Sequence, residues 1–246
     1  NYCASGQTED YYMPVTMTKP GYISVIRKKD MKLMHQVFLE GTEADIKTGY
    51  KYMHGVNSPD MKEMLITINE SDTPADNKDY GNTAGKMHMV VLDTAALEKG
   101  EVKVLRKGVA DGNFKSTISF RQYYSPDGKY IANATGDILF LVQADNLKVL
   151  DAETISPIEQ LHDAIFTPDG RYVVATSRTK AIKPDCVDKL HPGPDEYTMD
   201  GHLKLYDVKA QKFVGESTST CLACHDEQLG KDYAHAVLCG LDVNWK

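Results

Sequence analysis

The stretch Ser125-Pro126-Asp127-Gly128-Lys129-Tyr130 decides the fold, because it recurs along the chain. It returns about 42 residues later as Thr167-Pro168-Asp169-Gly170-Arg171-Tyr172, and a degraded copy stands at Ser58-Pro59-Asp60-Met61-Lys62. In such a stretch proline sets φ at the first corner, aspartate bonds its own backbone and glycine supplies a positive φ. Each copy therefore predicts a tight turn that leads into a β-strand.

A second module alternates with this turn. A glycine or aspartate is followed by a strand-like run and a lysine-bearing turn, in copies that span 21–34, 85–104, 136–150 and 201–213. Runs of strand length, rich in β-branched and aromatic residues, lie at 21–26, 64–68, 87–93, 130–133, 138–142, 172–176 and 203–207. Four copies of a unit with four strands predict an all-β chain folded as a β-propeller of about four blades.

The length of 246 residues suits a single large all-β domain that spans 1–246. A ring of four blades is at the small limit for a propeller. The alternative is a part-propeller, whose open edge strands need cover from a partner or a second copy. Two copies would then close a ring of eight blades.

Composition excludes several classes of function. The chain has 28 basic and 35 acidic residues, a net charge of -7, and shows no local basic patch, so we expect no binding to nucleic acid or anionic lipid. No apolar run approaches the roughly 18 residues of a membrane span. Asn1 is not an initiator methionine, so we expect that an upstream segment, such as an export signal, has been removed.

The alternating strand and turn modules resemble a known family. They are similar to the periplasmic propellers of seven and eight blades that include the haem-d-binding domain of haem-cd nitrite reductases. The resemblance covers roughly 21–246, although this chain shows only about four blades. Because the turn motif is widespread among propellers, the resemblance supports the fold far more than an activity.

The motif that carries chemistry is Cys221-Leu222-Ala223-Cys224-His225. Two cysteines at this spacing can add to the two vinyl groups of one haem, and the adjacent imidazole reaches the iron as the proximal ligand. The chain lacks a second Cys/His pair at the spacing of a zinc site, and a redox dithiol usually belongs to a βαβ unit. The motif therefore predicts one covalent haem c, as in c-type cytochromes.

The second axial ligand is less defined, and His235 is the first choice because it follows His225 by ten residues across a polar turn. The segment 179–200, which shows no strand pattern, offers His191 and Met199 as alternatives. A methionine ligand would raise the reduction potential relative to two histidines.

Two further histidines have the same placement as His235, each just ahead of a blade turn. These are His54 and His162, and their pseudo-equivalent positions would gather them on one rim of a propeller. They can hydrogen-bond a neighbouring blade, or they can hold a second haem or a metal. They are therefore also alternative iron ligands.

The five cysteines are consistent with export, because covalent haem is attached outside the cytoplasm, where disulfides also form. Once two cysteines bind haem, Cys186 and Cys239 are candidates for a disulfide, and Cys3 remains unpaired. The favoured hypothesis is a periplasmic cytochrome that passes single electrons to a redox partner, as a subunit of a respiratory complex. The alternative is an enzyme that reduces a small nitrogen oxide at a second cofactor on the rim.

Overall fold

The structure is a computed structural model of the chain. It describes residues 5–16, 21–47, 49–70, 86–110, 119, 121–135, 138–155, 159–182 and 197–219. In this part of the chain four antiparallel sheets follow one another, each with four strands in sequence order. We call these sheets blades 1 to 4.

The strands of the four blades have the following bounds. Blade 1 comprises β1 (Ser5–Gln7), β2 (Tyr11–Pro14), β3 (Ile23–Arg27) and β4 (Lys32–Val37). Blade 2 comprises β5 (Lys51–Asn57), β6 (Glu63–Asn69), β7 (Met87–Asp93) and β8 (Val104–Ala110), with the short helix α1 (Thr94–Leu97) between the last two strands. Blade 3 comprises β9 (Arg121–Tyr124), β10 (Tyr130–Ala134), β11 (Ile138–Gln143) and β12 (Val149–Thr154). Blade 4 comprises β13 (Glu159–Phe166), β14 (Tyr172–Ile182), β15 (Tyr197–Asp207) and β16 (Lys212–Ser219).

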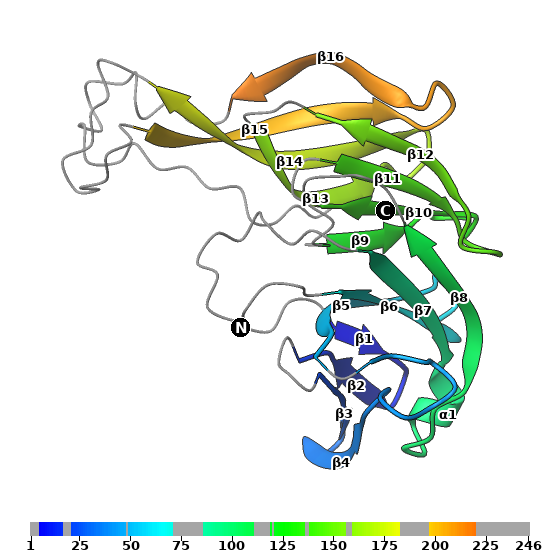
Figure 1. The fold of residues 1–246 in the computed structure, drawn as a ribbon. Coiled ribbons are helices and arrows are strands. Elements are labelled where there is room, and N and C mark those ends of the chain that lie inside the picture. The colour runs from blue at the N-terminus through cyan, green and yellow to red at the C-terminus, as the bar shows by residue number, and fades with distance from the viewer. Residues whose placement is uncertain are drawn as a thin grey trace.

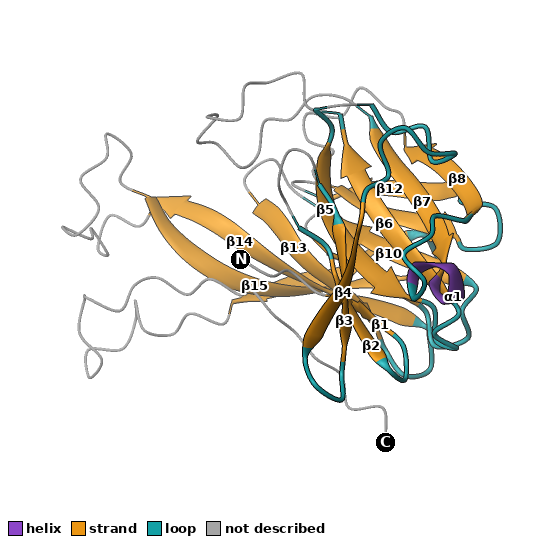
Figure 2. Ribbon diagram, turned by 90° about the horizontal axis from the view of Figure 1, so that it is seen from below, coloured by secondary structure: helices purple, strands orange, loops and turns teal. Residues whose placement is uncertain are grey.

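The blades are arranged side by side in an arc that does not close into a ring (Figure 1). The first strands of successive blades, β1, β5, β9 and β13, contact one another and form the inner edge of the arc. Figure 2 shows the described chain as almost entirely strand, with α1 as its one helix. That helix is too short to cross a membrane, so the described residues contain no membrane-spanning helix. The predictions of an all-β fold and of four blade repeats are confirmed.

The tight turns have the geometry that their sequences predict. Gly128 and Gly170 have φ of 72° and 69°, and Met61 takes the same position in the degraded copy with φ of 59°. The aspartate carboxylate accepts a hydrogen bond from the backbone two residues later, at 3.1 Å for Asp127 and 3.0 Å for Asp169. The hydroxyl that opens each turn also accepts a backbone N–H of the next strand, as Ser125 Oγ does from Tyr130 at 2.9 Å.

The hydrophobic core lies between the blades rather than at one centre. Three separate clusters of buried side chains fill the three junctions between neighbouring blades. The junction of blades 2 and 3, for example, joins Leu65, Met89 and Val91 to Ile131 and Phe140. Each blade is therefore a thin sheet that buries apolar side chains on the face it turns to a neighbour.

One prediction about secondary structure is wrong in part. We expected the segment 179–200 to lack strands, but β14 runs on to Ile182 and β15 begins at Tyr197. The two strands pair along their whole length and extend beyond their neighbours (Figure 1). Backbone pairing with an adjacent strand overrides the polar composition, because β propensity depends on context.

Candidate functional site

Most of the predicted haem residues fall outside the described part of the chain. These are Cys221, Cys224, His225, His235 and His191. The three cysteines considered for disulfides, Cys3, Cys186 and Cys239, also lie outside the described residues. The last described strand, β16, ends at Ser219, two residues before Cys221. Met199 does not belong to a loop, because it lies in β15 opposite Lys180.

His54 and His162 both lie on first strands, which form the inner edge of the arc. His54 lies in β5 of blade 2 and His162 in β13 of blade 4. A β-bulge interrupts the strand pairing at both places, between Tyr52 and His54 and between Leu161 and Ala164. Bulges re-aim side chains and are frequent next to functional sites.

The register of the turns places Asp163, not His162, at the position of His54. Counting back four residues from Ser58, Ser125 and Thr167 gives His54, Arg121 and Asp163. The prediction that His54 and His162 occupy equivalent positions is therefore wrong by one residue, because His162 corresponds to Met53. We name His54, Arg121, His162 and Asp163 the inner-strand cluster.

Three members of the cluster form an electrostatic group. Arg121 Nε lies 3.5 Å from Asp163 Oδ1, and His162 Nδ1 lies 3.6 Å from Asp163 Oδ2. Asp163 is fully buried, and neither of its oxygens accepts a hydrogen bond from a described residue. The carboxylate is thus held by electrostatic attraction to Arg121, and no described residue uses its capacity to accept hydrogen bonds.

His54 is the fourth member and is fully buried. Burial above all, together with the electrostatic interactions of Arg121 and His162, lowers the pKa of His54 to about 3. The imidazole is therefore neutral at neutral pH. None of the described residues forms a hydrogen bond with Nδ1 or Nε2. A buried polar group without a partner costs about 1–3 kcal/mol, so such a group in a folded protein needs an explanation.

A network of neutral groups supports the cluster. Gln122, the neighbour of Arg121, is fully buried and donates from Nε2 to the backbone carbonyl of His54 at 2.9 Å. Its Oε1 accepts from Thr67 Oγ1 at 2.9 Å and from Ser119 Oγ at 3.0 Å. These bonds join blade 2 to blade 3 and hold the two inner strands in register.

Arg121, Gln122 and Asp163 are not among the residues predicted from the sequence. No motif marks them, and a lone charged residue in a strand usually lies on a solvated face. The signal that identifies two of them is the count of four residues back from the hydroxyl that opens each turn. That count becomes meaningful only once the blades are known to align at their turns.

The described residues do not form a metal site with three protein ligands. Among them, no group of three His, Cys, Asp or Glu side chains has the placement to hold a metal ion. The inner-strand cluster instead contains one imidazole, that of His54, with no hydrogen-bond partner among the described residues.

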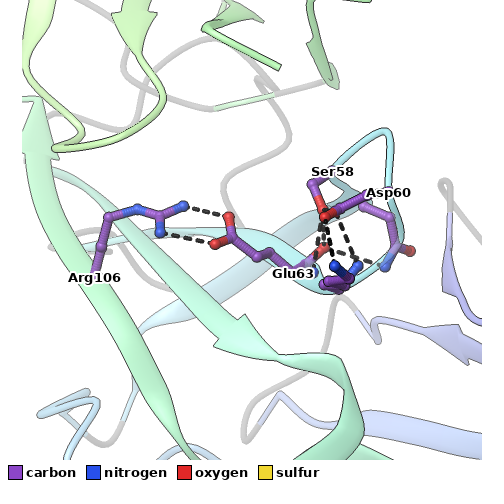
Figure 3. A network of polar contacts seen from close by, with 6 residues as sticks. Ser58, Asp60, Glu63 and Arg106 are labelled. Carbon is purple, nitrogen blue, oxygen red and sulfur yellow. Dashed lines mark hydrogen bonds and ion pairs between the residues drawn. The ribbon is translucent and has the colours of Figure 1, made fainter. Parts of the chain in front are cut away.

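A cleft of about 930 Å³ lies between blades 2 and 3, at the end that carries the tight turns. Arg106 binds both carboxylate oxygens of Glu63 there, with Nη1 at 2.9 Å from Oε1 (Figure 3). Ser58 Oγ donates to Asp60 Oδ1 at 2.6 Å, and Lys62 N donates to the same oxygen at 3.2 Å. Because these charged groups are paired with one another, we interpret this network as structural.

Comparisons by sequence find no relative. No family model matches the chain, and no curated protein is similar to it. Solved structures do match in shape. Hydrazine synthase from Kuenenia stuttgartiensis aligns with a TM-score of 0.55 and 14% identity, over 85% of this chain and 50% of that one. The chain is a β-propeller.

Two further structures align with this propeller. A protein from Lactobacillus plantarum aligns with a TM-score of 0.51 and 14% identity, over 88% of this propeller chain and 55% of its own. Dihydro-haem d1 dehydrogenase NirN, in complex with DHE, aligns with a TM-score of 0.47 and 16% identity, over 87% of this chain and 37% of the NirN chain. This propeller chain thus spans about half the length of the first two structures, and at such identity the likeness shows the fold alone.

Proposed function

We propose that this protein is a periplasmic c-type cytochrome that transfers single electrons through one covalent haem. The observation that carries the proposal is the motif Cys221-Leu222-Ala223-Cys224-His225. Two thiols and one imidazole at this spacing are the donor set that binds the two vinyl groups and the iron of one haem. When bound, the haem would supply a redox centre of one electron.

The motif residues have distinct roles in this proposal. Cys221 and Cys224 form the thioether bonds, and His225 is the proximal ligand. His235 is the proposed distal ligand, with Met199, His191, His162 and His54 as alternatives. A redox partner protein delivers or receives the electron, and a partner that covers an open blade would make the protein a subunit of a larger complex.

Intact mass and a visible spectrum test the proposal. The chain, produced in a periplasm that attaches haem, should exceed its polypeptide mass by one haem. The reduced protein should have the spectrum of a haem with two strong ligands and should not respond to carbon monoxide. Changing Cys221 and Cys224 together to serine should abolish the added mass, whereas changing His35 to glutamine should leave the mass and the spectrum unchanged. An unmodified mass for the wild-type chain would overturn the proposal.

The distal ligand needs its own variants. His235→Ala should open the sixth position of the iron, so that the reduced protein binds carbon monoxide. If His235→Ala keeps the wild-type spectrum, the same measurement on Met199→Ala and His191→Ala separates the alternatives. Ready binding of carbon monoxide by the wild type would contradict a haem with two histidine ligands.

The inner-strand cluster supports a second candidate function, a reductase of a small nitrogen oxide or a similar substrate. Its fully buried His54 has no hydrogen-bond partner among the described residues, so the imidazole is available to a second haem or metal. Such a group would supply a reducible centre that the c-type haem feeds with electrons. Iron and other metals counted per chain decide between the two functions, because a single iron and no other metal leaves only the electron carrier.

A further inference from the structure

A pocket of about 320 Å³ lies on blade 2 and is built mainly on the two outer strands of that blade. Residues 88–90 of β7 and 107–109 of β8 form one wall, and the connection from β4 to β5 forms the other. Glu70, which follows β6, and Tyr50, which precedes β5, also line the pocket. This volume is at the small end of those that bind ligands, so the pocket suits a molecule of about one ring.

Glu70 and His88 form a hydrogen-bonded pair in this pocket. His88 Nε2 lies 2.7 Å from Glu70 Oε1, and the Tyr50 hydroxyl donates to the same oxygen at 3.0 Å. Partial burial favours the neutral carboxyl, but the hydrogen bonds from His88 and Tyr50 outweigh it and lower the pKa of Glu70. An ionised carboxylate can only accept, so Nε2 carries the proton and the lone pair of the neutral imidazole lies on Nδ1.

His88 Nδ1 is the ring atom that a ligand can reach. The side chain is 21% exposed, and within the described part of the chain its one hydrogen bond is that of Nε2. The Tyr50 ring packs beside the imidazole, with centroids 5.2 Å apart and planes tilted by 33°. Glu70 and Tyr50 thus fix the orientation of the imidazole. Glu70 also stabilises the positive charge that forms when Nδ1 accepts a proton.

A cation lies near His88 on the same face of the sheet. His88 pairs with Val109 and Val90 pairs with Lys107 across β7 and β8, so Lys107 is a diagonal neighbour of His88. The Lys107 ammonium donates to the Glu43 carbonyl at 3.0 Å, which uses one of its three N–H groups. A negative charge that forms between His88 and Lys107 is therefore stabilised by the ammonium.

The charges that line the pocket balance, and the rest of its wall is largely apolar. Asp45 and Glu70 oppose Lys47 and Lys107, so the pocket favours neither an anion nor a cation from solution. The apolar part of the wall includes Ala44, Ile46, Val90 and Val109. The ligand that matches this lining is a neutral apolar ring that carries one acidic hydroxyl group.

We infer that this pocket binds a small phenol and that His88 Nδ1 takes the proton of its hydroxyl group. The O–H bond breaks, its electron pair stays on the phenol oxygen beside Lys107, and the proton forms the second N–H of the imidazole. This inference does not rest on the haem proposal, because every residue in it lies in blade 2 or in the connection that precedes it. Either one can therefore fail without the other.

Binding of 4-cyanophenol to the full chain tests the inference. Calorimetry measures the affinity, and the infrared nitrile band of the probe reports whether the bound phenol is ionised. The wild type should bind the probe as the phenolate at a pH at which the free probe is neutral. 4-Cyanotoluene lacks the hydroxyl group and should bind about tenfold more weakly, because it cannot donate a hydrogen bond to His88.

Two variants separate proton transfer from a merely structural role of the pair. Glu70→Gln keeps an acceptor for Nε2 but removes the negative charge, so the bound probe should stay neutral. His88→Gln keeps a donor to Glu70 but removes Nδ1, so the affinity for the probe should fall about tenfold. His35→Gln in β4, outside the pocket, is the matched control and should bind the probe as the wild type does.

Circular dichroism should show the wild-type sheet content in all three variants, so that a lost signal is not a lost fold. The inference is wrong if the wild type does not bind the probe or binds it as the neutral phenol. It is equally wrong if 4-cyanotoluene binds as tightly as the probe, if His88→Gln keeps the wild-type affinity, or if the probe is still ionised in Glu70→Gln.

Discussion

At the scale of the residue, the position before the lysine or arginine of each tight turn requires a left-handed backbone. Glycine meets this requirement in blades 3 and 4 without cost, whereas Met61 meets it in blade 2 at φ of 59°. A residue with a Cβ pays about 1–2 kcal/mol for that conformation. The degraded copy of the turn is therefore tolerated because the surrounding hydrogen bonds hold it, including Met61 N to the Ser58 carbonyl at 2.9 Å.

Met61→Gly should raise the free energy of unfolding by about 0.5–1 kcal/mol, because relief of the left-handed conformation exceeds the entropy that glycine adds to the unfolded chain. The methionine side chain is 43% exposed, so little packing is lost. Urea unfolding measures the change. The reciprocal variant Gly128→Ala should lower the free energy of unfolding by about 1 kcal/mol. A loss of stability in Met61→Gly would show that the side chain matters more than the backbone.

The buried imidazole of His54 should make the protein sensitive to mild acid. Burial depresses its pKa in the folded state to about 3, whereas the unfolded chain takes up a proton below about 6.5. The stability contributed by the neutral imidazole is therefore present above pH 6.5 and is lost by about 1.4 kcal/mol per pH unit as the pH falls toward 3.

Urea unfolding of wild type and of His54→Gln between pH 7 and pH 5 measures this contribution. The wild type should lose stability over that interval more steeply than the variant. The carboxylates are the same in both proteins, so their contribution cancels in the comparison. That of Asp30, whose pKa the hydrogen bond from Arg27 lowers to about 2, is lost only as the pH falls below about 4. Equal slopes for the two proteins would contradict a buried neutral imidazole at this position.

At the scale of the element, the inner strands do more than line the arc. β5 and β9 are joined by Gln122, whose side-chain amide bonds groups of both blades, and β9 and β13 are joined by the ion pair of Arg121 with Asp163. Polar contacts therefore fix the inner edge, while apolar contacts fill the remainder of each junction. The Gln122 side chain has partners for its amide nitrogen and its oxygen, and satisfied hydrogen bonds of this kind specify one register between strands.

Gln122→Met should lower the free energy of unfolding by about 3 kcal/mol. The two side chains have similar volume, but the methionine leaves the hydroxyls of Thr67 and Ser119 and the carbonyl of His54 without their partner. Gln143→Met in the same blade is the control, since Gln143 borders the open cleft and should cost far less. Similar losses for both variants in urea unfolding would show that the Gln122 network contributes no more than a half-buried amide beside the cleft.

At the scale of the whole molecule, four thin sheets share three cores, one at each junction between neighbouring blades. A propeller junction is a contact between unlike faces, because each inner blade turns one side to the blade before it and the other side to the blade after it. Blade 3 contributes Ile131 and Phe140 to one core and Ala132 and Leu141 to the next.

Much of the fold could be predicted because its signals are local. The turn at Ser125 to Tyr130 needs a positive φ within a few residues, and the strand over 87–93 shows its β-branched composition directly, so both coincide with the structure. The extension of β14 and β15 could not be predicted, since it depends on pairing between two polar strands. For the candidate site, the sequence alone marked His54 and His162 through their distance from the turns.

The sequence by itself determined the repeat, the all-β class and the motif at 221–225, because each is written in neighbouring residues. Only the tertiary structure decided that Arg121 and Asp163 join the histidines, and that His54 lies buried without a hydrogen-bond partner among the described residues. The physical reason is that bulges and blade packing select which side chains meet at the inner edge. The same packing buries Val91 and Leu141 between blades, whereas Leu205, at the same register position in blade 4, is 41% exposed.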